Sequence, residues 1–522
     1  LRGMMAQVQD DLPGRAQQTL AQEGREGLRD LLHRHESTEV RSFDAYRRLI
    51  QLYIEFGFDA DARRCLDRIP GLLQRPGLAM LRTLLAPKIP QDRAEIDAAW
   101  DAASRGLDRI RESGGTVNRP IPEIGRTLHF RFSYHGYSVR EFNEKVARTF
   151  EAVVPGLRWV APDGHSRKRH RRVGVLFNWG AASAMGRAFQ TTFLRLQAHG
   201  MEPIGIFVAG NRPGELPGIS RWVRIPEHIG RARKILADLE LDWLIFTEIG
   251  MEIVPYLLAF SRFARVQVVM GGHPATSGCP EIDAFVVPAE GVHDESDQFF
   301  TEELVRLSGL MFPAQDKMPD VRGSPSILSR LGIPPHARVY YVPNHPQKII
   351  PEFDRIVATV LDRDPSARVV FARPHMAERA GFFEPFLQRL RRTLGDAMTR
   401  VTWHEMLPLP EFARLCTEVD VVMDTPAFGM GTTTYYAHWY GTPVIGYDGK
   451  SIAERASVAL LRRFGLDELI AQSHDDIAWL ALWVANDRRE RDRISARLIA
   501  RREAVFEHDT FSEALARYIA RR

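Results

Sequence analysis

The chain has 522 residues, of which 44% are hydrophobic and 26% are charged, and its formal net charge is only +4. This is the composition of an ordinary soluble globular protein with room for about three domains. The small net charge argues against a nucleic-acid-binding surface, and we interpret the one dense basic run, RKRHRR at residues 167–172, as a solvated linker.

The cysteines and the apolar runs restrict the class of protein further. Cys65, Cys279 and Cys416 lie far apart and form no CxxC pair, which argues against a disulfide framework and a structural zinc site. No apolar run has the length needed to span a bilayer, and the opening LRGMMAQVQDDLPGR does not resemble a signal peptide. We therefore expect a cytoplasmic protein without an integral membrane segment. Because the sequence opens on leucine, we expect further residues upstream of it.

The first part of the chain has the apolar spacing of helices. In residues 43–72, Leu49, Leu52 and Phe56 recur at helical intervals, and a turn at Gly57 separates two short helices. This pattern resembles one tetratricopeptide-like (TPR-like) hairpin, without a clear second copy at the period of about 34 residues. We expect residues 1–125 to form an all-helical module that braces the rest of the chain or offers a surface to a partner.

The pattern then changes from helices to short strands. A looser stretch leads to Tyr134-His135-Gly136, and a helix is expected at residues 139–153. Apolar, β-branched runs follow, separated by helical or turn segments, as in a doubly wound parallel sheet. The predicted strands are residues 172–177, 204–208, 243–246, 266–270 and 284–287. We assign this first Rossmann-like lobe to residues 126–320.

A proline-rich hinge at residues 318–335 leads into a second lobe, assigned to residues 321–522. Its predicted strands are residues 339–342, 369–372, 401–403, 419–423 and 444–446, and long helices are expected at 475–485 and 492–506. An α/β protein with two Rossmann-like lobes after a helical module has the GT-B architecture. Ligands of such folds bind in the crevice between the lobes.

The most informative segment is DTPAFGMGTTTYYAHWYGTPVIGYDG at residues 424–449. A strand runs into a Gly-Met-Gly turn, and three threonines then open a helix. Glycines allow a ligand to approach the backbone closely, and the amides and hydroxyls at a helix start favour phosphate. The segment therefore predicts a site for a nucleotide diphosphate, and the alternative is a glycine-rich connection that binds nothing.

Five blocks of sequence resemble the bacterial members of the O-GlcNAc-transferase-like family of glycosyltransferases, which also includes cytoplasmic enzymes that N-glycosylate bacterial adhesins. The blocks are TEIGM (247–251), VQVVMGGHPATSG (266–278, continued by EIDAF at 281–285), NHPQKIIP (344–351), the segment 424–449, and AERASVALLRRFGLDELIA (453–471). The likeness extends from about residue 128 to the end of the chain. It implies an inverting, metal-independent enzyme that moves a sugar from a UDP-sugar, its donor substrate, to protein side chains, with no cofactor.

The resemblance assigns the phosphate contacts to the second lobe. Lys348 precedes Pro351, which suits the first residue of a helix, and its compact charge would stabilise the departing phosphate. Gly431, Thr432, Thr433 and Thr434 would donate to the same diphosphate. The alternatives are a solvated loop lysine and threonines that only cap a helix.

Two residues of the first lobe are candidates for the acceptor side. His273, in the Gly-Gly-His-Pro turn after a strand, is a candidate to position the acceptor or to take its proton. Glu248 follows the strand at 243–246, where the family usually has an aspartate. The alternatives are a histidine that holds its turn and a glutamate that anchors its loop.

Arg414 and Arg455 are further candidates for contacts with the nucleotide base and the phosphate, respectively, with surface helix positions as the alternative. Two features depart from the family: Tyr436 stands where relatives carry an acid that holds the ribose, and the loop at 178–187 lacks a histidine. The triplet Asp362-Arg363-Asp364 has a DxD pattern, but it precedes a proline at a helix end, and we interpret it as a turn.

Two other functions remain open on the sequence alone. The first is a catalytically silent protein on the same scaffold that binds a nucleotide or a partner, which Tyr436 motivates. The second is an enzyme that resembles a sugar-nucleotide epimerase, although no paired carboxylates support it.

Overall fold

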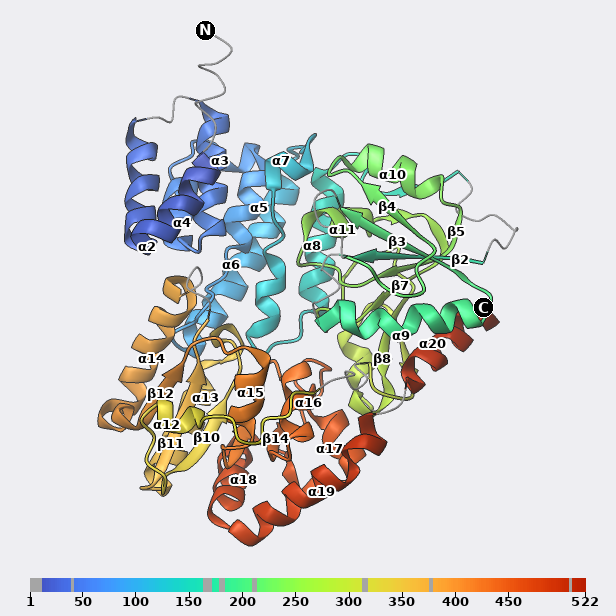
Figure 1. Ribbon diagram of the computed structural model, residues 1–522. Helices are drawn as coiled ribbons and strands as arrows, with labels where there is room; N and C mark the ends of the chain where they lie inside the picture. The colour runs from blue at the N-terminus through green and yellow to red at the C-terminus, as the bar shows by residue number, and fades with distance from the viewer. Residues whose placement is uncertain are drawn as a thin grey trace.

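The computed structural model describes residues 12–38, 42–162, 171–177, 184–208, 214–311, 318–374, 379–506 and 509–522. Most of the basic run at 167–172 and most of the loop at 178–187 lie outside these residues. The chain forms a helical N-terminal part and two α/β lobes (Figure 1). Along the described chain, no helix has both the length and the apolar character that a membrane crossing requires.

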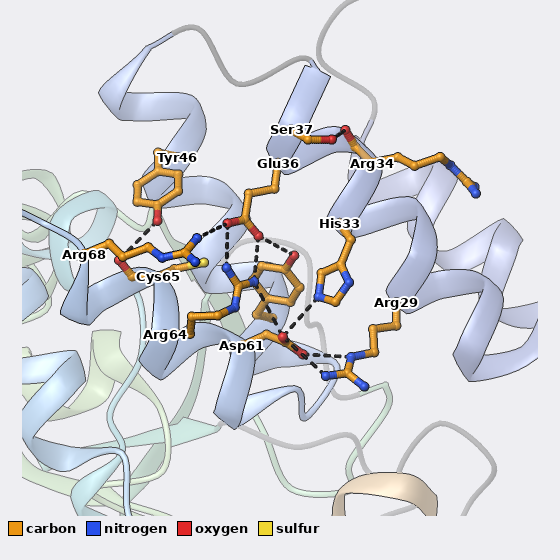
Figure 2. Close-up of polar contacts among 11 residues, drawn as sticks. Arg29, His33, Arg34, Glu36, Ser37, Tyr46, Asp61, Arg64, Cys65 and Arg68 are labelled. Atoms are coloured by element: carbon orange, nitrogen blue, oxygen red, sulfur yellow. Dashed lines mark hydrogen bonds and ion pairs between the residues drawn. The ribbon is translucent and has the colours of Figure 1, made fainter.

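The N-terminal part is helical, as predicted. Its helices are α2 (Leu12–Thr38), α3 (Phe43–Glu55), α4 (Asp59–Asp67), α5 (Pro76–Leu84), α6 (Arg93–Glu112), α7 (Pro120–Ile124) and α8 (Arg140–Val153). The hairpin of α3 and α4 turns at Gly57, whose φ of 75° favours glycine. Figure 2 shows how charged side chains join α2 to α4: Arg64 binds Glu36 with two contacts of 2.8 Å, and Asp61 accepts from Arg29 at 3.0 Å.

The first lobe contains a parallel sheet with the strand order β4-β3-β2-β5-β7-β8-β9 in the described residues. These strands are β2 (Arg172–Phe177), β3 (Glu202–Val208), β4 (Arg221–Ile225), β5 (Leu241–Phe246), β7 (Ala264–Met270), β8 (Ala284–Pro288) and β9 (Glu303–Leu307). The central strands are buried and match the five predicted ones. The sequence analysis missed the edge strands β4 and β9, in which charged residues interrupt the apolar pattern. The helices of this lobe are α9 (Ala184–Ala198), α10 (Ile229–Ala237) and α11 (Ile253–Leu258), and β1 (Trp159–Val160) pairs with β6 (Ser261–Arg262).

The second lobe has its own parallel sheet, whose described strands follow the order β12-β11-β10-β13-β14-β15. They are β10 (Arg338–Val342), β11 (Ala367–Ala372), β12 (Val401–His404), β13 (Val421–Met423), β14 (Val444–Tyr447) and β15 (Ile470–Ala471). The helices are α12 (Ile327–Arg330), α13 (Pro351–Arg363), α14 (Glu384–Leu394), α15 (Leu409–Cys416), α16 (Thr432–Trp439), α17 (Val458–Phe464), α18 (His474–Asn486) and α19 (Arg488–Phe506). All five predicted strands and both long helices are present, and only the two-residue β15 was missed.

The last helix, α20 (Thr510–Arg521), differs from our assignment of the chain end to the second lobe. It packs on α9 of the first lobe, where Ser512 contacts Thr191 and Thr192 at 2.9 and 3.0 Å. Its apolar residues Phe511 and Leu515 are buried in the core on that side of the first sheet. The two lobes are therefore joined at two places, by the hinge before α12 and by the return of the chain after α19 (Figure 1).

The helical part braces both lobes at one junction. Arg93, at the start of α6, donates to Glu352 of the second lobe at 2.6 Å and to the carbonyl of His135 at 3.0 Å. His135 in turn accepts from Trp100 Nε1 at 3.2 Å through Nδ1. Because a tryptophan only donates, His135 carries its proton on Nε2, which faces the carbonyl of Pro87 at 3.1 Å. The Tyr-His-Gly turn thus links the helical part to the cleft.

Candidate active site

Lys348 lies at the carboxyl end of β10, in the turn that leads to α13. Its Nζ donates to the carbonyl of Gly429 at 3.1 Å and lies 4.7 Å from the ring centre of Phe428. Burial lowers the pKa of Lys348, and the nearby Asp424 carboxylate partly offsets this effect. As predicted, Pro351 is the first residue of α13. The structure therefore brings the lysine against the glycine turn that precedes the three threonines.

The side chain of Asp424 holds the glycine turn in place. The sequence analysis did not name this residue as a candidate. Its carboxylate is 1% exposed, and its Oδ1 accepts from the amides of Thr425 and Met430, both at 2.8 Å. Its Oδ2 has no hydrogen-bond partner among the described residues. Burial raises the pKa of Asp424, although these hydrogen bonds and Lys348 act in the opposite direction. A signal was available in the sequence, because Asp424 directly follows β13 and opens the segment that leads to the glycine turn.

The threonines begin α16 as predicted, with Gly431 at the N-cap position. They do not act alike: Thr434 is buried, and its hydroxyl donates to the carbonyl of Met430 at 3.3 Å, so it supports the helix. Thr432 and Thr433 are partly exposed, and a Cβ placed on Gly431 would meet no atom within 4 Å. The first amides of a helix lack partners inside the helix. Open space therefore adjoins amides and hydroxyls that suit a phosphate.

His273 lies in the first lobe and contacts residues of both lobes. It is 5% exposed, and its ring centre lies 5.2 Å from Phe428, 5.5 Å from Tyr134 and 6.1 Å from Phe130. Its Nε2 has no hydrogen-bond partner in the described part of the chain. Burial lowers the pKa of His273 to about 3, and the positive charge of Lys348 contributes to the shift. The ring is therefore neutral near pH 7, and its Nε2 is left without a protein partner in the described residues.

The contacts of Glu248 are those of a loop anchor, the alternative that we weighed against a role on the acceptor side. The side chain is fully buried, and its Oε2 accepts from the amide of Met251 at 2.9 Å. A Cβ on Gly272 would lie 2.5 Å from the Cβ of Glu248, so the turn that carries His273 packs directly on this residue. In this arrangement Glu248 supports the His273 turn.

Tyr436 and Arg414 lie on neighbouring helices, α16 and α15. Tyr436 is partly exposed and makes an edge contact with Phe412 at 6.0 Å between ring centres. Arg414 forms an ion pair at 2.7 Å with Glu418, which lies just beyond the end of α15, and its side chain is 26% exposed. Glu418 also accepts from the first amides of α12. The structure therefore ties Arg414 to the frame of the second lobe, next to Tyr436.

Arg455 is buried in the boundary between the lobes and does not lie at an open helix start. Its guanidinium contacts the carboxylate of Asp448, and it donates to the carbonyls of Gly449 at 3.0 Å and Gly291 at 3.3 Å. Burial lowers its pKa. Gly291 belongs to the first lobe, so Arg455 connects the lobes. Its Nη2 has no hydrogen-bond partner among the described residues.

A cavity of about 360 Å³ opens between the lobes beside these residues. Its walls include Gly136, Pro274 and Thr276 on one side and Ala427, Tyr447 and Gly449 on the other. A larger cavity of about 570 Å³ is lined by residues around α7 and α10, none of them from the second lobe. None of the predicted site residues lines either cavity. The smaller one is lined by Pro274 and Thr276, which follow His273, and by Ala427, which precedes the glycine turn, so it is the cavity nearer to the candidate site.

The DxD triplet ends α13, as the sequence indicated. Asp364 is buried and accepts from Arg338 at 2.5 and 2.6 Å and from Tyr340 at 2.8 Å. Over the described ranges, no group of three His, Cys, Asp or Glu side chains could hold a metal ion. The triplet therefore has a structural role in the second lobe.

Comparison with known proteins identifies the second lobe. Residues 324–515 match the model described as glycosyl transferase family 41, and they include Lys348, Asp424 and the three threonines. The matched range covers nearly all of the lobe that carries the glycine turn. The chain therefore carries a glycosyl transferase family 41 domain.

Two curated relatives are similar over longer stretches. A UDP-glucose:protein N-beta-glucosyltransferase of Actinobacillus pleuropneumoniae is 26% identical over 407 residues, which cover 74% of this chain and 62% of the relative. A probable UDP-N-acetylglucosamine–peptide N-acetylglucosaminyltransferase SPINDLY of Hordeum vulgare is 28% identical over 263 residues, 49% of this chain. The match spans only 27% of the length of the barley protein.

A solved structure supports the architecture. A mutant of the Thermobaculum terrenum O-GlcNAc transferase superposes with a TM-score of 0.67 over 99% of this chain and 98% of that chain, at 19% identity. At this identity the likeness concerns the fold. The predicted GT-B arrangement of two Rossmann-like lobes with a helical N-terminal part is confirmed.

Proposed function

We propose that this protein, whose second lobe is a glycosyl transferase family 41 domain, transfers a sugar from a UDP-sugar to protein side chains. The observation that carries the proposal is the contact of Lys348 with the carbonyl of Gly429 at 3.1 Å. It puts a partly buried cation beside the start of α16, where open space adjoins Gly431. A pyrophosphate bound there would contact the cation and the amides of Thr432 and Thr433.

In this proposal, Lys348 stabilises the charge that remains on the nucleotide. The sugar departs from the terminal phosphate oxygen, and negative charge develops there as the bond breaks. Because burial lowers its pKa, the ammonium gains from an anionic partner. Asp424 supports the site by closing the turn through the amides of Thr425 and Met430.

His273 would act on the acceptor. The acceptor oxygen or nitrogen attacks the anomeric carbon, the bond from that carbon to the phosphate oxygen breaks, and Nε2 of His273 takes the acceptor proton. One displacement of this kind inverts the anomeric centre. The pKa of about 3 makes His273 a weak base in the empty cleft, partly because of Lys348. A bound diphosphate would offset the charge of Lys348 and thereby strengthen the base.

The acceptor class rests on the relatives. The printed names of the Actinobacillus and barley relatives describe transfer to protein and to peptide, respectively. We propose the same class, a serine, threonine or asparagine side chain, for this chain. The proposal includes a cytoplasmic location, transfer without a metal ion, and the helical part as the surface that approaches the acceptor protein.

Two measurements test the function. Calorimetry with UDP should show binding at micromolar to low millimolar concentration, and absence of binding at millimolar UDP would contradict the proposal. Mass spectrometry of proteins co-expressed with the chain should reveal added hexose, deoxyhexose or N-acetylhexosamine. The same spectra from cells that express Lys348→Ala should lack these additions.

A second function, a silent nucleotide-binding protein, is favoured by one observation. Tyr436 presents a phenol that is engaged with Phe412, and a phenol makes fewer hydrogen bonds than a carboxylate. UDP binding without any sugar transfer in the co-expression experiment would support this second function.

A further inference from the structure

The turn that carries His273, residues 271–278, is fixed at both ends by close backbone contacts. A Cβ on Gly272 would lie 2.4 Å from the carbonyl oxygen of Thr247. A Cβ on Gly278 would lie 2.6 Å from the backbone of Asn143. Both glycines also have positive φ angles, of 63° and 69°. Below, these eight residues are called the His273 loop.

The last part of the His273 loop is held by one acidic side chain, Glu302, which precedes β9. Its Oε1 accepts from the amide and the hydroxyl of Ser277 at 2.8 and 2.5 Å. Its Oε2 accepts from the hydroxyls of Thr276 at 2.6 Å and Thr301 at 3.1 Å. Thr276 and Pro274, from the same loop, line the cavity between the lobes.

The carboxylate of Glu302 is unusual because it is buried without a cation. The residue is 6% exposed, and among the described residues no lysine, arginine or histidine forms an ion pair with it. A buried charge is costly unless hydrogen bonds or an opposite charge compensate it. Here the compensation comes from hydroxyl and amide donors, most of which belong to the His273 loop.

We propose that Glu302 is a positioning residue, which holds the His273 loop in the geometry required on the acceptor side of the cleft. The expected effect on catalysis rests on the proposed function. The role of Glu302 in holding the His273 loop does not depend on that function. Glu302 touches neither the cavity nor the space at Gly431, so it acts through Thr276 and Ser277.

Both oxygens of Glu302 act as acceptors in this hydrogen-bond pattern. Ser277 Oγ accepts from the amide of Cys279 at 3.0 Å and donates to Oε1. Thr276 Oγ1 accepts from the amide of Thr301 at 3.0 Å and lies 2.8 Å from Thr301 Oγ1, and at least one of these two hydroxyls donates to Oε2. A glutamine offers one acceptor oxygen and an NH₂ group, and the NH₂ group would face a hydroxyl that already donates. The substitution Glu302→Gln keeps the shape of the side chain but replaces one acceptor oxygen with a donor group.

The test compares Glu302→Gln with Glu303→Gln in the full chain. Glu303 is the next residue, and its side chain is 60% exposed, so it provides a matched control. Amide hydrogen exchange should become about tenfold faster in residues 271–279 of Glu302→Gln and should stay within about twofold of wild type in residues 425–434. Glu303→Gln should leave both segments within about twofold of wild type.

A spectroscopic measurement separates positioning from general destabilisation. The ¹³Cε1 signal of His273, assigned by its loss in His273→Asn, should shift or broaden in Glu302→Gln. The affinity for UDP should stay within about twofold, because the second lobe is untouched. An unchanged His273 signal together with unchanged exchange in residues 271–279 would overturn the proposal. So would equal acceleration of exchange in both segments.

The catalytic consequence is measured separately. With a UDP-sugar and an acceptor protein found in the co-expression experiment, Glu302→Gln should lower kcat at least about tenfold and leave KM for the UDP-sugar within about twofold. A wild-type protein that binds no UDP and transfers no sugar would contradict the proposed function. In that case the exchange and the His273 signal would still decide the role of Glu302.

Discussion

The two loops that meet at Phe428 hold their polar groups in different ways. On the second lobe, the partly buried Lys348 and the buried Asp424 contact a glycine turn, next to open space at Gly431. On the first lobe, the neutral His273 sits among aromatic rings, and the charged side chain that supports its loop, Glu302, lies behind it. The charged side chains of the second lobe face the cleft, whereas the charged Glu302 of the first lobe does not.

If the protein transfers a sugar as proposed, this difference divides the work between the two lobes. The second lobe places a fixed charge where a diphosphate needs it, and such preorganised charge costs no rearrangement during the reaction. The first lobe keeps a proton acceptor neutral by burial. The acid prediction below acts on histidines of both lobes, and each of the others changes one side of this comparison.

Acid should affect the neutral side most strongly. Burial lowers the pKa of His129, His273 and His438 to about 3 and that of His135 to about 4. The unfolded chain binds these protons below about pH 6.5, whereas the folded chain does not, so stability falls as the pH drops from 6.5 toward 4. Each histidine should contribute about 1.4 kcal/mol at pH 5.5, or roughly 6 kcal/mol together.

Urea unfolding at pH 7.5 and pH 5.5 measures this loss. Burial also lowers the pKa of His404 and His474, which adds to the loss, whereas the raised pKa of Asp424 acts in the opposite direction. Equal free energies of unfolding at the two pH values would show that the histidines are charged or solvated. The difference between a charged glycine turn and a neutral His273 loop would then be wrong.

Replacement of His273 by alanine should remove the proton acceptor and leave the diphosphate site intact. We expect kcat for transfer to fall by about 10²–10⁴, the usual range for general acid–base catalysis. The affinity for UDP should change by less than about threefold, because the contacts of Lys348 with Gly429 remain. His336→Ala, at an exposed turn before β10, provides the control. Transfer at the wild-type rate would contradict the role of His273.

Replacement of Lys348 by alanine should affect the diphosphate site of the second lobe and leave the His273 loop unchanged. Loss of a charge-assisted contact worth about 1.5–3 kcal/mol should weaken UDP binding by about tenfold or more. The fold should be retained, with an unchanged circular dichroism spectrum. Lys234→Ala removes an exposed lysine of α10 and should bind UDP normally. If both variants bind UDP like the wild type, Lys348 is not part of the site.

His438 tests the support beneath the threonines. It lies in α16, is fully buried, and neither ring nitrogen has a hydrogen-bond partner in the described residues. Leucine at this position would remove two unsatisfied polar atoms, so His438→Leu should raise the free energy of unfolding by about 1–3 kcal/mol. Its stability should also depend less on pH, by about 1.4 kcal/mol per unit below pH 6.5. A less stable variant would indicate that His438 has a partner in the folded protein.

Tyr436 should give the smallest effect. If its side chain lies at the ribose, Tyr436→Glu would supply two acceptor oxygens for the hydroxyls and improve UDP affinity by a factor of about two to five. The measurement is calorimetry with UDP, and Tyr435→Glu on the same helix is the control. Unchanged or weaker binding would place Tyr436 away from the ribose.

The sequence predicted the central fold well because buried parallel strands are continuous apolar runs. It missed β4 and β9, since Arg221, Arg224 and Glu303 interrupt the pattern at sheet edges that solvent reaches. It also assigned α20 to the second lobe, because amphipathic spacing does not reveal which core a helix covers. The packing of Phe511 and Leu515 on the first lobe is a long-range contact.

The candidate site was predictable where local sequence determines geometry. Lys348 before a helix-starting proline and Gly431 before the threonines fall where the sequence placed them. The partners of Arg455 and Glu302 could not be predicted, because they come from distant segments. Gly291 lies 164 residues from Arg455, and Thr276 lies 26 residues from Glu302.

A crystal structure with bound UDP tests the central claim most directly. We predict that the β-phosphate lies within hydrogen-bond distance of Lys348 Nζ and of the amides of Thr432 and Thr433, between the glycine turn and the His273 loop. A UDP molecule bound elsewhere, or a Lys348 ammonium that points away from the phosphate, would contradict the account.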